Sequence, residues 1–151
     1  MVPDSKNFYS KAPPQRGASS FVYPPSPDNL DFFCNALNAG CLVAVPTETV
    51  YGLAAVALDP VACRSIFSVK GRPLMDPLIV HVVDLHMAEQ LAELPKELEL
   101  LAKAFWPGPL TVVLNKKTVV PDLVTAGKQT VAIRMPRHEV LQKLLKGLQK
   151  P

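Results

Sequence analysis

Residues 41–70 have the sequence CLVAVPTETVYGLAAVALDPVACRSIFSVK, in which two short apolar runs are followed by a helical segment. The run Cys41–Val45 has the length of a buried strand, Pro46 ends it, and a second strand is predicted over Leu53–Leu58. The pair Asp59-Pro60 then starts a helix, because aspartate caps a first turn and proline is favoured at the first helical position. Strands that alternate with helices predict an α/β fold with a substantially parallel or mixed sheet.

The rest of the chain continues this alternation. Further helices are predicted from Ser26-Pro27, from Asp84, and over Pro95–Phe105 and Val140–Leu148, and further strands over Pro77–Val83, Leu110–Leu114 and Val131–Ile133. The segment from Asn115 to Gln129 is predicted to be a surface connection. We therefore expect one domain over residues 28–151, preceded by a flexible Pro/Ser-rich extension over residues 1–27.

The composition narrows the class of protein. Hydrophobic residues make up 48% and charged residues 19%, as in globular proteins, and the net charge of +3 suits an anionic ligand better than a large nucleic-acid surface. No apolar run approaches the ~20 residues that cross a bilayer, so no membrane partner is expected. The three cysteines form no C-x-x-C pair, which favours buried thiols in a reducing compartment. The expected location is the cytoplasm, with organellar targeting as the alternative.

The loop that follows the first predicted strand is the first candidate site. It has the sequence Thr47-Glu-Thr-Val-Tyr-Gly52, so hydroxyls and a carboxylate are close together. These groups can hydrogen-bond a zwitterionic small molecule, and glycine permits close approach of the backbone. The structural alternative is a capped turn.

Two cations, Lys70 and Arg72, form the second candidate. They lie one residue apart on a turn stiffened by Gly71 and Pro73. Lysine as a point charge and arginine as a bidentate donor both suit phosphate oxygens. The alternative is that both charges lie in water at a helix C-terminus, where cations are favoured.

The third candidate is Arg134, which ends an apolar strand in Thr130-Val-Ala-Ile-Arg-Met-Pro136 and is expected at the rim of the sheet. That position suits a carboxylate, and a solvated arginine at an edge strand is the alternative. His81 lies on the apolar strand Leu78–Val82, where a satisfied core histidine is the usual explanation. The three histidines lack metal-ligand spacing, so no metal site is predicted.

Five segments occur together and in order along the chain: Pro46-Thr-Glu-Thr-Val-Tyr-Gly-Leu53, Lys70-Gly-Arg-Pro73, Pro77-Leu-Ile-Val-His81, Phe105-Trp-Pro-Gly-Pro-Leu-Thr111 and Val131-Ala-Ile-Arg-Met-Pro136. In order and spacing the chain resembles the YrdC-like family of threonylcarbamoyl-adenylate synthases, from about Asn29 to its last residue. The resemblance implies a single YrdC-like α/β domain with a twisted mixed or parallel sheet flanked by helices.

The resemblance also implies an activity. The family joins L-threonine, bicarbonate and ATP, with Mg²⁺ expected on the phosphates, to give threonylcarbamoyl-adenylate for tRNA modification, so tRNA or its modification machinery is an implied partner. Thr49, His81 and Arg134 would bind threonine. Lys70 and Arg72 would be catalytic and would bind the ATP phosphates, with Asp76 and Thr130 also at the nucleotide.

The chain departs from the family pattern in two places. Asp76 stands where the family usually has asparagine, which puts a negative charge near the phosphates. The chain ends at Pro151, about where the family continues into a strand with a Ser-x-Asn element, so a C-terminally truncated domain is expected. The alternative function that follows is a module that binds nucleotide or RNA without turnover, because one wall of the site is missing.

Overall fold

The computed structural model describes residues 22–151, so the predictions for residues 1–21 lie outside the described part. The helices are α1 (Pro27–Asn38), α2 (Pro60–Lys70), α3 (Leu85–Leu91), α4 (Glu97–Phe105), α5 (Asp122–Thr125) and α6 (Glu139–Leu148), and the strands are β1 (Val43–Val45), β2 (Gly52–Ala54), β3 (Ile79–His81), β4 (Thr111–Asn115) and β5 (Thr130–Arg134). This order confirms the predicted α/β fold. No helix within the described residues is long and apolar enough to cross a membrane.

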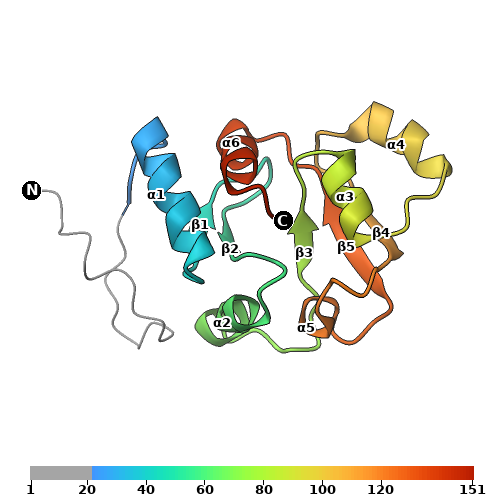
Figure 1. Ribbon diagram of the computed structural model, residues 1–151, viewed down its shortest axis with the longest axis horizontal. Helices are drawn as coiled ribbons and strands as arrows, with labels where there is room; N and C mark the ends of the chain where they lie inside the picture. Colours follow the sequence, from blue (N-terminus) through green and yellow to red (C-terminus); the bar gives the residue numbers. More distant parts are fainter. Residues whose placement is uncertain (1–21) are drawn as a thin grey trace, which may run out of the picture.

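The strands form two sheets within the described residues, where the sequence suggested one. β1 pairs with β2 in antiparallel fashion, and β5 lies between β3, to which it is parallel, and β4, to which it is antiparallel. Figure 1 shows β1 and β2 beside α1 and α6 in one half of the molecule, and the three-stranded sheet in the other half. The C-terminus lies between β2 and β3 (Figure 1), where the carbonyl of Pro151 accepts a hydrogen bond from the amide of Ala57 at 2.9 Å.

Local side-chain chemistry sets where the helices begin. The Asp59 carboxylate accepts hydrogen bonds from the amides of Val61 and Ala62 at 2.9 and 3.1 Å, and Pro60 follows as the first residue of α2. Ser26 caps α1 and Asp84 caps α3 in the same manner. These three helix starts confirm the sequence predictions. Gly71 ends α2 with φ of 60°, a left-handed conformation that a residue without a Cβ adopts at little cost.

The two faces of the three-stranded sheet differ. Side chains alternate along a strand, and Val80, Val131 and Ile133 point to a face where they are at most 2% exposed and pack in one core with residues of α3, α4 and α5. Directly paired residues share a face, so the opposite face carries Ile79, His81, Thr111, Val113, Asn115, Thr130, Ala132 and Arg134. Its members are half-buried or exposed. We call this surface the open face.

The prediction that residues 115–129 form only a surface connection is wrong. The segment contains α5, and Val120, Val124 and Thr125 are 2%, 0% and 1% exposed. Val124 also accepts a backbone hydrogen bond from Leu78 at 2.8 Å, which ties α5 to the residue before β3. Polar residues at both ends of the segment made its short buried stretch hard to predict from the sequence. We call the buried residues Val120, Val124 and Thr125 the apolar anchor.

The anchor gives a test of packing. We expect Val124→Ala to lower the free energy of unfolding by about 1.5–3 kcal/mol, because two buried methyl groups are lost and a cavity remains. Val119→Ala is the matched control, since Val119 is 49% exposed and its truncation should cost less than about 0.5 kcal/mol. Urea unfolding of both variants measures the difference, and equal costs would contradict the buried anchor.

Candidate functional site

Strand pairing brings His81, Arg134 and Thr111 to one end of the open face. His81 pairs with Arg134 across the parallel strands, and Arg134 pairs with Thr111 across the antiparallel strands. The Nε atom of Arg134 donates to the Thr111 hydroxyl at 2.8 Å. The Arg134 side chain is only 15% exposed, so its guanidinium is held in place rather than solvated as in the alternative interpretation.

Glu48 completes this group from the loop between β1 and β2. Its Oε1 lies 3.9 Å from Nη1 of Arg134, and its Oε2 accepts from the amide of Arg137 at 3.3 Å. The Glu48 side chain is 17% exposed, and its Oε1 is buried without a hydrogen-bond partner. We call Glu48, His81, Thr111 and Arg134 the strand-end group.

The hydroxyl of Thr47 organises the loop that carries Glu48. It donates to the carbonyl of Val50 at 2.6 Å and accepts from the amides of Thr49 and Val50, each at 3.1 Å. The Thr49 hydroxyl lies 3.0 Å from that of Thr47 and is exposed. The capped turn therefore exists, and it directs the side chain of Glu48 toward Arg134. The role of Thr49 itself stays a prediction.

The imidazole of His81 is largely buried, and its hydrogen bonding is incomplete. Its Nε2 is buried and has no hydrogen-bond partner, which differs from the satisfied core histidine of the alternative interpretation. The pKa of His81 is lowered from 6.5 to about 4, first by burial and then by the guanidinium of Arg134, while Glu48 acts in the opposite direction. His81 is therefore neutral near pH 7 and offers one ring nitrogen to a ligand.

Arg72 and Asp76 lie in the turn before β3. Arg72 donates from Nη2 to the carbonyl of Pro77 at 2.9 Å, and its Nε lies 3.9 Å from Oδ2 of Asp76. This pair is partly exposed, with side-chain exposures of 33% and 58%, so its attraction is weak. Lys70 is exposed in the last turn of α2, a position that also fits the alternative of a solvated charge. Its role stays a prediction.

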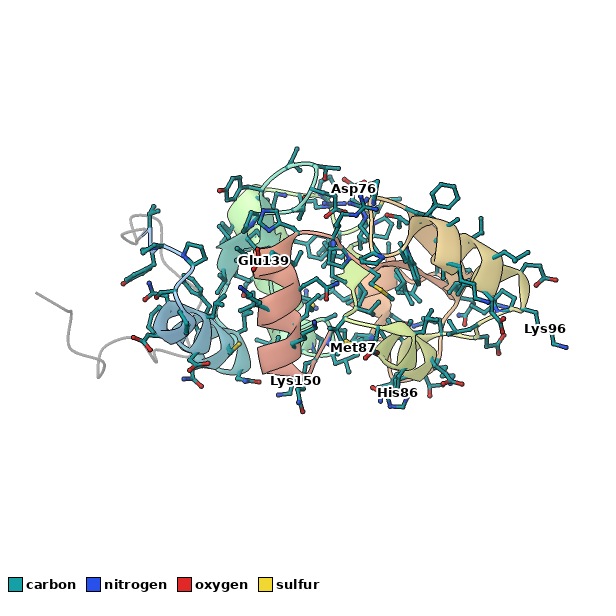
Figure 2. All side chains as sticks on the ribbon, turned by 90° about the horizontal axis from the view of Figure 1, so that it is seen from above. Asp76, His86, Met87, Lys96, Glu139 and Lys150 are labelled. Atoms are coloured by element: carbon teal, nitrogen blue, oxygen red, sulfur yellow. The ribbon has the colours of Figure 1, made fainter. Side chains whose placement is uncertain are left out.

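The predicted site residues fall into two groups along the sheet. β3 runs from the Arg72–Asp76 turn to His81, and β5 runs parallel to it from Thr130 to Arg134. Four steps of about 3.3 Å along β5 place Thr130 about 13 Å from Arg134. Figure 2 shows Asp76 and His86 of α3 on opposite sides of the sheet. Asp76 is therefore on the side of the open face, because α3 packs against the other face. A ligand that contacts both groups must therefore extend along the open face.

Sequence reasoning included Glu48 only as the carboxylate of the candidate loop Thr47–Gly52, without a specific role, and it did not assign Thr111 or Arg137 to the site. Glu48 and Thr111 lie within segments that pointed to a family, but their contacts depend on strand register and on partners far along the chain. Arg137 takes part through its backbone amide, which any residue except proline possesses. Among residues 22–151 no group of three or more His, Cys, Asp and Glu side chains could hold a metal ion.

Comparisons with known proteins identify a family and similar chains. The family model Sua5_yciO_yrdC, described as "Telomere recombination", matches residues 35–151. A threonylcarbamoyl-AMP synthase of Pyrococcus abyssi is 54% identical over 116 residues, which are 76% of this chain and 34% of the relative. One of Vibrio vulnificus is 36% identical over 126 residues, covering 82% of this chain and 68% of the relative.

A solved structure gives the same match in three dimensions. The crystal structure of P. abyssi Sua5 complexed with L-threonine superposes with a TM-score of 0.81 at 48% identity, covering 87% of this chain and 38% of that chain. The present chain thus spans about a third of the length of its archaeal relative.

The lowered pKa of His81 predicts a pH dependence of stability. The unfolded chain binds a proton at His81 near pH 6.5, whereas the folded protein binds it only near pH 4. The stability that the neutral imidazole contributes is therefore fully present above pH 6.5. As pH falls from 6.5 to 4, roughly 3 kcal/mol of this stability should be lost. Unfolding free energies of the parent and of His81→Gln, measured across this range, test it. A constant difference between the two would contradict the lowered pKa.

Proposed function

The chain belongs to the Sua5/YciO/YrdC family, and from this premise we propose that it forms threonylcarbamoyl-AMP and pyrophosphate from L-threonine, bicarbonate and ATP. The observation that carries the proposal is the strand-end group, in which a held guanidinium lies beside a neutral imidazole. The names of the relatives support the reaction, and the threonine in P. abyssi Sua5 supports the amino acid substrate.

The amino acid would bind at the strand-end group. Arg134 would donate to the threonine carboxylate from the nitrogens that the Thr111 contact leaves available. His81 would use its unpaired Nε2 on a polar group of the same molecule. Thr49, whose hydroxyl is exposed on the neighbouring loop, would supply a further hydrogen bond.

The nucleotide would lie toward the other end of the open face. Lys70 and Arg72 would bind the phosphates, with Asp76 and Thr130 at the same end of the strands. In the reaction the threonine amine and bicarbonate give a carbamate and water, and a carbamate oxygen then attacks the α-phosphorus of ATP and expels pyrophosphate. No covalent bond to the protein forms, so the residues act by positioning the reactants and by stabilising negative charge.

Mg²⁺ is expected to enter with ATP and to supply charge neutralisation on the phosphates. The product would be passed on to the threonylcarbamoyl modification of tRNA, which makes tRNA or its modification machinery the expected macromolecular partner. The modest net charge of +3 suits a protein whose substrates are small anions.

The test of the reaction is release of pyrophosphate that requires both threonine and bicarbonate. We expect Lys70→Ala or Arg72→Ala to lower this rate about 100-fold, because loss of one fixed cationic donor commonly costs about 3 kcal/mol in the transition state. Lys96→Ala at the start of α4 is the control and should retain the parental rate. Near-normal turnover of either site variant would remove that residue from the site, and absence of threonine-dependent turnover in the parent would reject the function.

Asp76 provides a separate test of the nucleotide end. Its carboxylate lies 3.9 Å from Nε of Arg72 and adds a negative charge where phosphates are expected. We expect Asp76→Asn to tighten ATP binding, since it removes the repulsion and leaves the guanidinium available to the nucleotide. Titration of both proteins with ATP measures this, and an unchanged affinity would show that the aspartate does not oppose binding.

A further inference from the structure

Two enclosed polar atoms of the strand-end group lack hydrogen-bond partners. They are Oε1 of Glu48 and Nε2 of His81, and both residues interact electrostatically with Arg134. A buried polar atom without a partner is costly, so native proteins retain one mainly where a ligand or water supplies the missing contact. The strand-end group therefore has hydrogen-bonding capacity that a ligand or water can use.

The contacts already made show which contacts are missing. Glu48 uses Oε2 on the amide of Arg137, and Arg134 uses Nε on the hydroxyl of Thr111. The distance of 3.9 Å between Oε1 of Glu48 and Nη1 of Arg134 is too long for a hydrogen bond. Each of the two opposite charges therefore keeps one side available.

The formal charges of the group sum to zero. Glu48 contributes −1 and Arg134 contributes +1, while the imidazole of His81 is neutral near pH 7. A ligand with only a carboxylate would satisfy Arg134 and would be repelled by Glu48. A zwitterion matches both charges, provided that its ammonium faces the carboxylate of Glu48.

We propose that Glu48 binds the α-ammonium group of the amino acid whose carboxylate is bound by Arg134, which makes Glu48 a specificity-determining residue of this site. The inference rests on the proposed function for its amino acid substrate. A purely structural role for Glu48 would use Oε2 on the amide of Arg137 and pair Oε1 with Arg134 at 3.9 Å, but it leaves Oε1 without a hydrogen bond.

Ligand titrations with L-threonine and with 3-hydroxybutanoate, which is threonine without its amino group, test the inference. The parent should bind threonine more tightly than 3-hydroxybutanoate. Glu48→Gln keeps an oxygen for the amide of Arg137 and removes the negative charge. It should therefore weaken the binding of threonine about 10- to 100-fold. The same variant should bind 3-hydroxybutanoate at least as tightly as the parent does. Glu89→Gln, an equal charge change at an exposed position of α3, is the control and should change neither affinity.

The outcomes separate the inference from the function. If Glu48→Gln binds threonine like the parent, or weakens both ligands equally, Glu48 does not bind the ammonium while threonine remains the substrate. If the parent binds both ligands equally, the inference is overturned even where the variant fails to fold. If the parent binds no threonine, the proposed function fails and the inference fails with it.

Discussion

The parallel register of β3 and β5 is the constraint on which the site depends. It sets His81 beside Arg134, and the antiparallel neighbour β4 then sets Thr111 within 2.8 Å of the guanidinium. Because side chains alternate between faces, the same register buries Val80 and Ile133 against the helices. A slip of one residue would bury the charged side chain and expose the apolar ones. Burial of the core and assembly of the site are thus two consequences of one pairing.

That register also decides how the charges are held. Arg134 and Glu48 are 15% and 17% exposed, so water screens them poorly and each needs a partner close by. The protein gives each residue one neutral hydrogen-bond partner, the hydroxyl of Thr111 and the amide of Arg137, and leaves the opposite charges 3.9 Å apart. Such a pair is only partly satisfied. Its remaining capacity is what a ligand can use.

The features that sequence predicted well are those that local chemistry controls. Asp59 caps α2 through amides two and three residues ahead, so the cap is visible in the sequence itself. The sequence placed the Glu48 carboxylate in a candidate loop but could not place it beside Arg134 and Arg137, because these partners are more than eighty residues away and meet it only after the strands pair. The apolar anchor at Val124 was missed because lysines and other polar residues surround it. The order of the strands was predicted, but the predicted second strand Leu53–Leu58 was wrong beyond Ala54, where β2 ends. The division into two sheets depends on pairing that no local pattern encodes.

The distance between the strand-end group and the residues near Thr130 limits which ligands can contact both. Between Arg134 and Thr130 the open face carries Ala132, flanked by Ile79 and Val113, which are 43% and 65% exposed. An amino acid alone reaches one group and leaves these apolar side chains in water. A molecule that joins an amino acid to a nucleotide crosses the small side chain of Ala132 and covers its two neighbours, so it gains apolar contact that neither part obtains by itself. The open face therefore suits a ligand long enough to contact both groups better than an amino acid alone.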